Sequence, residues 1–207
     1  MESKKANGDY KCGDVLTRLK NDFKNKCYIC ESKEPKSINV EHFVPHKDDN
    51  TLKFSWNNLF WACSHCNNIK LGNYDNILNC TDADDKVEEK LKYIFMPFPF
   101  EKVEVELLDD SDKSKYTQEL LLKVYNGTTK LKMIESSNLR NRLLEEIKSF
   151  QENLIDYFQE TNDAKDKEYI LMKIKGHLNR ASNFTSFKRC IIRRNETLLN
   201  EFKQYLT

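Results

Sequence analysis

Two cysteine pairs are the clearest chemical feature of this sequence. Two residues separate Cys27 from Cys30, and two separate Cys63 from Cys66. A C-x-x-C turn directs two thiolates at one point, and two such turns complete a tetrahedral shell of four sulfur ligands, which suits Zn(II). Redox use of one pair would need a βαβ unit beside it, and the sequence shows none. The spacing therefore predicts a closed, structural zinc site with no position left for a substrate.

The insert between the cysteine pairs contains an ordered series of polar side chains. An acidic residue and a histidine come first, ahead of a proline, and two asparagines follow; the second cysteine pair then runs into two more asparagines and a lysine. On a helix that begins near Ser64, positions i, i+3, i+4 and i+7 share one face. Those positions hold Cys63, Cys66, Asn67 and Lys70. The zinc anchor and two polar side chains are therefore predicted to lie along one stripe.

In this order, the pieces closely resemble the HNH endonuclease family. The segments that carry the resemblance are EHFVP at 41–45, WNNL at 56–59 and CSHCNNIK at 63–70, preceded by the first cysteine pair. The resemblance covers residues 27–71, about a fifth of the chain. It implies a ββα-metal module that hydrolyses phosphodiester bonds in nucleic acid. DNA is the first expectation and RNA a close second, because no residue of the site reports on the 2′-hydroxyl.

The resemblance also implies a role for each polar side chain of the insert. His42 would be the general base, since a neutral imidazole can take a proton from water at pH 7. Glu41 and Asn67 would hold a catalytic divalent ion that stabilises the departing oxygen. Asn58 would brace the loop that orients His42, and Lys70 would contact phosphate. Adjacent strand residues point to opposite faces, so a bend or loop must bring Glu41 and His42 to one reaction.

Two positions depart from the commonest family pattern. Glu41 stands where Asp or His is usual, and Asn67 stands where His is usual. Oxygen ligands at both positions favour Mg(II) or Mn(II) over a catalytic Zn(II). The remaining imidazoles of this segment, His46 and His65, are expected to be surface or phosphate-contacting residues rather than metal ligands.

A second, less specific resemblance concerns the whole chain. CYICE, EHFVPHK and WNNLFWACSHCNNIK, followed by a mostly helical half, resemble the HNH nuclease component of Septu-type anti-phage defence. This implies a separate ABC/SMC-like ATPase chain as partner and low activity of the nuclease alone. The sequence has no G-x-x-x-x-G-K, so any nucleotide dependence would come from that partner. A non-catalytic, zinc-stabilised adaptor and a purely structural subunit are the alternatives.

Composition and charge limit the other classes of function. The 207 residues are 39% hydrophobic and 32% charged, which is typical of a helix-rich globular protein. No apolar run approaches the roughly 20 residues of a membrane span, and no signal peptide is visible, so we expect a cytoplasmic protein without a membrane partner. The net charge is only +1, so nucleic acid must be bound by a local patch. The candidates for backbone phosphate contact, with a solvated helix face as the alternative, are Lys188, Arg189, Arg193 and Arg194.

The elements that must position these residues follow from the hydrophobic pattern. Apolar spacing predicts a helix over 14–25, then a β-hairpin with a long loop, then a helix from near Ser64 that ends before Gly72, a plausible cap. The aromatic residues of the hairpin are expected to be core rather than base-stacking side chains. The segment KVEVELL predicts one exposed strand, and helices follow from Tyr116 onward.

We therefore expect an α+β chain in three parts. Residues 1–26 form a helical lead-in, and residues 27–80 form the HNH module. Residues 81–207 form an acidic linker, a short strand and a helical region.

Overall fold

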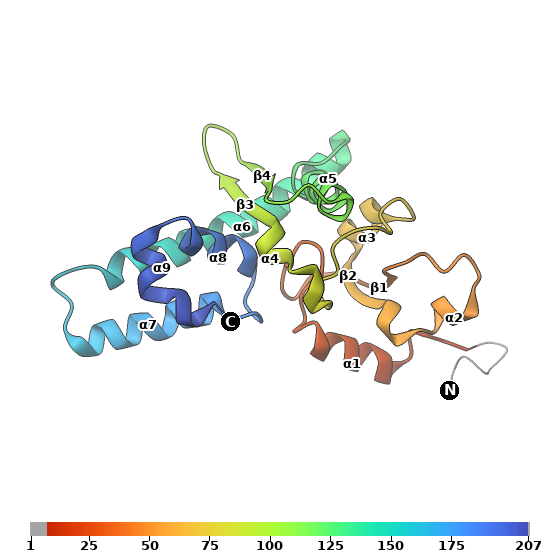
Figure 1. Cartoon of the computed structure of the whole chain (residues 1–207), viewed down its shortest axis with the longest axis horizontal. Helices are drawn as coiled ribbons and strands as arrows, with labels where there is room; N and C mark the ends of the chain where they lie inside the picture. The colour runs from red at the N-terminus through yellow and green to blue at the C-terminus, as the bar shows by residue number, and fades with distance from the viewer. Residues whose placement is uncertain (1–7, 207) are drawn as a thin grey trace.

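The computed structural model describes residues 8–206, so the start of the predicted lead-in lies outside the described residues. Two small antiparallel sheets combine with helices, and the N-terminal elements lie at the opposite end of the molecule from the last helices (Figure 1). The strands are β1 (Ile38–His42), β2 (Leu59–Cys63), β3 (Leu91–Met96) and β4 (Lys102–Leu107). The helices are α1 (Gly13–Asp22), α2 (Asn50–Lys53), α3 (Ser64–Lys70), α4 (Val87–Lys90), α5 (Asp112–Asn126), α6 (Lys130–Tyr157), α7 (Ala164–Leu178), α8 (Thr185–Arg193) and α9 (Glu196–Phe202).

The predicted hairpin and the helix after it are present. β1 pairs antiparallel with β2, with Ile38 opposite Cys63 and His42 opposite Leu59. Every residue of β2 is buried, as its apolar sequence LFWAC predicts. α3 starts directly after β2 and contacts both strands, and the Cys63 sulfur accepts the Cys66 backbone N–H at 3.4 Å.

α3 ends before Gly72, as expected, but Gly72 is not the residue that caps it. The residue with positive φ after the helix is Leu71, at φ 43° and ψ −141°, whereas Gly72 does not adopt a positive φ. The Leu71 N–H bonds to the Asn67 carbonyl, which closes the last turn. The backbone therefore turns one residue earlier than the glycine suggested.

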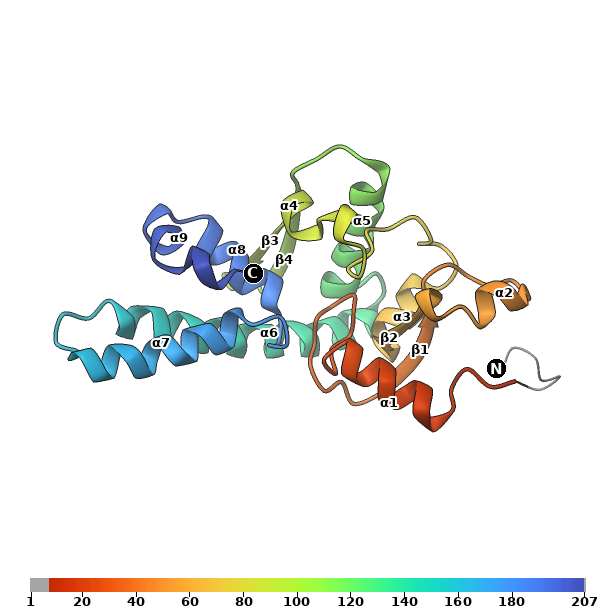
Figure 2. The ribbon, with the colours of Figure 1, turned by 60° about the horizontal axis from the view of Figure 1, so that its bottom comes forward.

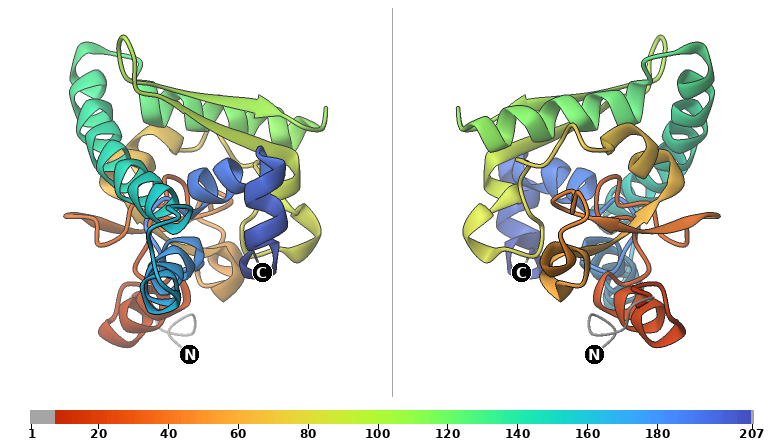
Figure 3. Two further views of the ribbon diagram at one scale, coloured as in Figure 1. Left: turned by 90° about the vertical axis from the view of Figure 1, so that its left-hand side faces the viewer. Right: turned by 90° about the vertical axis from the view of Figure 1, so that its right-hand side faces the viewer.

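The second sheet corrects the prediction of one exposed strand. β4 pairs antiparallel with β3, with Leu91 opposite Leu107. One face of the pair is buried, through Val103 and Val105 on β4 and Tyr93 on β3. α5 packs along β4, as both views of Figure 3 show. The segment LKYIFM shows no clear alternation of apolar and polar residues, because apolar side chains also occupy the less buried positions of β3.

Most of the predicted helical stripes are core. On α5 the whole stripe is buried: Leu120, Leu121, Val124 and Tyr125. α6 has 28 residues and a length of about 42 Å, and its stripe is buried from Leu139 to Leu154. At the end of α6 two apolar side chains face solvent, since Ile155 is 64% exposed and Phe158, directly after the helix, is 45% exposed.

The buried apolar side chains of residues 8–206 form three clusters. The four cysteines share one buried cluster with side chains of α5, α6 and α8, and the Tyr125 hydroxyl donates to the Cys30 carbonyl at 2.7 Å. A second cluster joins the end of α6 to α7 and α9. A third packs α1 against β1 and β2, with α1 beside the hairpin in Figure 2. The hairpin and its cysteines are therefore held from both sides. Across residues 8–206, no helix is long and apolar enough to cross a membrane.

Candidate active site

The four cysteines come together as a potential metal site. Their sulfur atoms all lie within 4.8 Å of one another, all four residues are buried, and the sulfurs of Cys30 and Cys63 are 3.9 Å apart. Ligands of a tetrahedral Zn(II) ion with Zn–S bonds of about 2.3 Å are spaced by about 3.8 Å. The donor set therefore fits one Zn(II) ion with every ligand position taken by sulfur.

Burial and crowding control the protonation of these thiols. Burial raises the pKa of the Cys66 thiol well above its usual value, and the three neighbouring sulfurs raise it further. Four such thiols cannot all lose their protons without a compensating cation. Zn(II) binding would release those protons and fix the turn before β1 to the start of α3.

His42 has the geometry of a neutral base. Its Nε2 lies 3.0 Å from the backbone carbonyl of Lys53. Because a carbonyl oxygen only accepts, Nε2 carries the hydrogen and Nδ1 keeps the lone pair. Burial lowers the pKa of His42 and outweighs the opposite effect of that hydrogen bond, while the charges of His46, Lys11 and Lys53 lower it further. The imidazole is thus neutral at pH 7, with Nδ1 as the proton acceptor.

Asn58 closes the loop that carries the hydrogen-bond partner of His42. Its side-chain amide donates to the carbonyls of Val44 at 2.9 Å and Leu52 at 3.1 Å, and its oxygen accepts the Val44 N–H at 2.7 Å. Asn58 is only 6% exposed. These bonds tie the start of the loop to α2, next to the Lys53 carbonyl that holds His42.

Glu41 and Lys70 form a buried pair with each other. Lys70 Nζ lies 2.8 Å from Glu41 Oε1, and the Tyr28 hydroxyl donates to Glu41 Oε2 at 2.6 Å. The two remaining hydrogens of Lys70 point to the carbonyls of Phe43 at 2.8 Å and His42 at 3.3 Å. Lys70 is 0% and Glu41 5% exposed. In this arrangement Lys70 is not placed to contact phosphate, because its ammonium is enclosed and fully paired.

The same pair affects the expected divalent ion. Burial raises the pKa of Glu41, and the charge of Lys70 opposes that shift. Both carboxylate oxygens already accept a hydrogen bond, one of them from a cation, so the carboxylate does not fit a divalent ion as arranged. Asn67 is partly exposed, and its side chain makes no hydrogen bond with the other described residues.

The two further histidines have different surroundings. The His46 ring lies 4.6 Å from the His42 ring, and His46 Nδ1 accepts the Asp48 N–H at 3.1 Å. The His65 side chain is 14% exposed, and both ring nitrogens are occupied: Nδ1 lies 2.6 Å from the Glu135 carboxylate and Nε2 lies 2.8 Å from the Val124 carbonyl. The expectation of a surface or phosphate-contacting role is therefore corrected for His65, which fastens α3 to α5 and α6.

Two members of the predicted basic cluster, Lys188 and Arg189 on α8, are buried. Lys188 and Arg189 are 0% and 1% exposed. Arg189 and Arg193 are both paired with Glu88, and Arg194 alone of the four is exposed. The predicted phosphate contact is therefore corrected for Lys188 and Arg189. The sequence could not show that carboxylates far away in the chain, Glu146 and Glu88, pair with Lys188 and Arg189.

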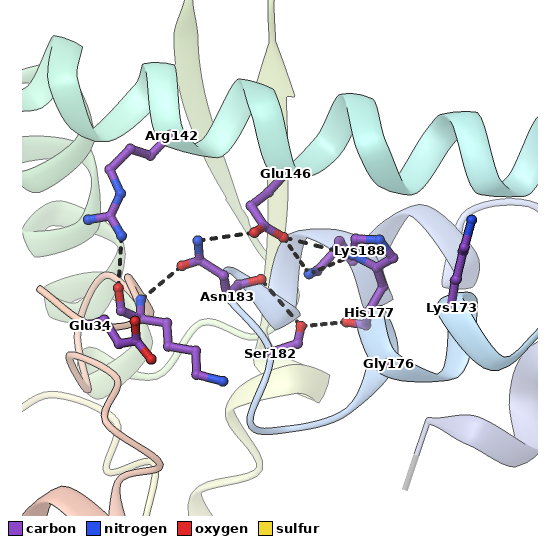
Figure 4. A pocket seen from close by; sticks show the side chains of 10 residues that line it. Glu34, Arg142, Glu146, Lys173, Gly176, His177, Ser182, Asn183 and Lys188 are labelled. Atoms are coloured by element: carbon purple, nitrogen blue, oxygen red, sulfur yellow. Dashed lines mark hydrogen bonds and ion pairs between the residues drawn. The ribbon is translucent and has the colours of Figure 1, made fainter.

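Lys188 lines a polar hollow of about 660 Å³ between α6, α7 and the start of α8 (Figure 4). Its ammonium lies 3.1 Å from Glu146 and 3.3 Å from His177 Nδ1. Burial lowers the pKa of Lys188 and also that of His177. Because Glu146 neutralises Lys188, the buried cation of this hollow, we interpret the contacts among Glu146, His177 and Lys188 as a polar network that braces α6 against α7 and α8.

Several residues around the site were missed by sequence reasoning. Tyr28 holds Glu41, and Tyr10 places its ring 4.7 Å from the His42 ring. Tyr28 lies inside the first C-x-x-C turn, so its closeness to the site could have been suspected. Tyr10 lies 32 residues before His42, and no local pattern joins the two.

Residues 27–71 match the family model described as HNH endonuclease. The matched segment contains the four cysteines, His42 and Asn58 and covers about a fifth of the chain. No curated protein and no solved structure matches the chain. The match places an HNH endonuclease domain at residues 27–71, and it indicates nuclease activity in general, with nucleic acid as the substrate.

Proposed function

We propose that this chain is an endonuclease that hydrolyses phosphodiester bonds, with DNA as the first substrate and RNA as the alternative. The observation that carries the proposal is the His42 imidazole. Its Nε2 is held by the Lys53 carbonyl, which leaves Nδ1 as the base within a segment matched to HNH endonucleases. In the reaction, Nδ1 accepts a proton from water while the water oxygen attacks phosphorus, and the bond from phosphorus to the leaving oxygen breaks.

The other residues of the site support His42 in this proposal. Asn58 keeps the loop closed, so that the Lys53 carbonyl holds one tautomer of the imidazole. The cysteine cluster, with Zn(II) bound, fixes the turn and the helix on either side of the hairpin. Lys70 holds the end of β1 through the carbonyls of His42 and Phe43. Lys70 is thus a positioning residue in this account.

Dependence on Mg(II) or Mn(II) stays a prediction. HNH nucleases use a divalent ion, which would stabilise charge on the departing oxygen. Asn67 is partly exposed and could bind such an ion, whereas both carboxylate oxygens of Glu41 accept hydrogen bonds from Lys70 and Tyr28. We therefore expect activity to require a divalent ion whose ligands include Asn67.

The wider setting is also a proposal. The resemblance of CYICE, EHFVPHK and WNNLFWACSHCNNIK to the Septu-type nuclease component supports a role in bacterial anti-phage defence, in the cytoplasm, with an ABC/SMC-like ATPase as partner. A nuclease in this setting has to be restrained in the absence of infection. The chain alone is therefore expected to cleave slowly.

A non-catalytic adaptor is the second candidate. The observation that favours it is the Glu41 carboxylate, which is occupied by Lys70 and Tyr28 rather than open to an ion. An adaptor would bind nucleic acid or its partner through the zinc-stabilised module. Its biological effect would not change in His42→Ala.

The test compares supercoiled plasmid with total tRNA in Mg(II), Mn(II) or EDTA. The variants are His42→Ala and, as a matched control, His177→Ala, which removes an imidazole from α7. We expect cleavage of plasmid that requires the divalent ion, is lost in His42→Ala and persists in His177→Ala. Cleavage of tRNA alone would name RNA as the substrate. Equal cleavage by wild type and His42→Ala would refute the proposed base.

A further inference from the structure

Two lysines stand on aromatic rings beside His42. Lys11 Nζ lies 5.3 Å from the centre of the Tyr10 ring, and Lys53 Nζ lies 5.4 Å from the centre of the Phe54 ring. The two rings meet edge to face at 6.5 Å, and the Tyr10 ring contacts the His42 ring at 4.7 Å. The two ammonium groups therefore lie against one cluster of rings, which also contains the imidazole of the proposed base.

Both lysines can reach a ligand. Lys11 is exposed and Lys53 is partly exposed. No ion pair joins either ammonium to a carboxylate within the part of the chain that the structure describes. An ammonium held over an aromatic face loses less conformational entropy when it binds an anion than a freely moving one does. Their positive charges also reach His42, since both lower its pKa.

Lys70 cannot supply the cation that a scissile phosphate needs. Its ammonium is 0% exposed, and all three of its hydrogens point to acceptors inside the protein. A phosphodiester held at His42 carries a negative charge and must be met by other groups. Lys11 and Lys53 stand on rings of the cluster around the imidazole, and neither has a carboxylate partner among residues 8–206.

We propose that Lys11 and Lys53 form the phosphate-binding pair of this site, in place of Lys70. The pair holds backbone phosphates of the nucleic-acid strand on which His42 acts, so the identity of the ligand rests on the proposed function. Lys11 lies outside the matched segment 27–71. Residues 10 and 11, before α1, thus complete the site, and the packing of Tyr10 in the cluster of α1, β1 and β2 anchors them.

The test measures binding apart from cleavage. Fluorescence anisotropy of a labelled oligonucleotide gives the dissociation constant between 50 and 200 mM KCl, in a His42→Asn background that leaves the strand intact. The slope of log K against log salt reports the number of phosphates contacted, at about 0.7–0.9 per contact. We expect Lys11→Met and Lys53→Met each to lower the slope by that amount, and the double variant to lower it by both.

Matched variants separate this effect from general loss of charge or of folding. Lys11→Arg and Lys53→Arg keep the cation and should keep the slope. Lys167→Met removes a lysine from α7, at the opposite end of the molecule from β1 in Figure 1, and should leave the slope unchanged. The pair is refuted if the slopes of Lys11→Met and Lys53→Met equal that of the parent, or if Lys167→Met lowers the slope as much.

The design also separates this inference from the proposed function. If His42→Ala cleaves plasmid as fast as wild type, the proposed base is wrong, and the salt slopes still report on the lysine pair. If His42→Ala is inactive but the slopes do not change, the lysine pair alone is wrong.

Discussion

At the scale of single residues, the orientation of the His42 imidazole depends on its hydrogen-bond partner. The imidazole is fixed by one backbone carbonyl, and that carbonyl belongs to a loop closed by Asn58. Hydrolysis slows when the base can rotate away from the orientation in which it accepts a proton from water. Activity and stability are therefore coupled through a side chain that touches no substrate.

Asn58→Ala tests this coupling. The substitution removes three hydrogen bonds and leaves the Val44 N–H without its partner, so we expect a loss of about 1–3 kcal/mol in the free energy of unfolding and slower cleavage. Urea unfolding and plasmid cleavage measure the two effects. The control is Asn57→Ala, at the exposed neighbouring position. Equal behaviour of the two variants would show that Asn58 braces nothing.

Lys70→Met tests the buried pair. Removal of one partner leaves the Glu41 charge uncompensated in the interior, which costs about 3–5 kcal/mol in stability. Glu41→Gln combined with Lys70→Met should lose less than Lys70→Met alone, since no buried charge remains. Thermal unfolding of wild type, Lys70→Met and the double variant measures these differences in stability. A stable Lys70→Met with weakened nucleic-acid binding would instead make Lys70 a phosphate contact.

At the scale of elements, the stretch from Cys27 to Lys70 could be predicted because its signals are local. Cysteine spacing, the apolar run of β2 and the helix after it all lie within a few residues of one another. The Glu41 pairing and the inward face of α8 could not be predicted in the same way. Both depend on residues brought together from far apart, such as Lys70 with Glu41 and Glu88 with Arg189.

The end of α3 gives a prediction at this scale. Leu71 is 59% exposed and adopts a backbone conformation that favours glycine, with a strain of about 1–3 kcal/mol. Leu71→Gly should therefore raise stability by about 1 kcal/mol, after the entropy cost of glycine. Gly72→Ala should be close to neutral, because an added Cβ would meet only Pro45, at 3.8 Å. If urea unfolding shows that Leu71→Gly is no more stable than wild type and that Gly72→Ala is destabilised, the residue that requires glycine is Gly72 rather than Leu71.

At the scale of the whole molecule, the four clustered cysteines share one core with side chains of α5, α6 and α8. Tyr125 on α5 bonds to the Cys30 carbonyl, and α3 is fastened to α5 and α6 through His65. This continuity was not visible in the sequence, where an acidic linker suggested separate parts. The division at residues 27–80 and 81–207 stays a prediction.

Metal removal tests the shared core. We expect one Zn(II) per chain by native mass spectrometry, and a single thermal transition that moves to lower temperature when a strong chelator removes the ion. Circular dichroism should show loss of helix from the helical region together with the hairpin, because their cores are continuous. Two separate transitions, with the helical one unaffected by the chelator, would show that the parts fold independently.

The proposed nuclease activity depends on His42 as its base. The most direct measurement is the rate of plasmid cleavage by wild type, His42→Ala and His177→Ala, side by side in Mn(II). We expect cleavage by wild type and His177→Ala, and at least a hundredfold slower cleavage by His42→Ala, because base catalysis contributes about 10²–10⁴-fold. A His42→Ala rate equal to that of wild type would contradict this expectation.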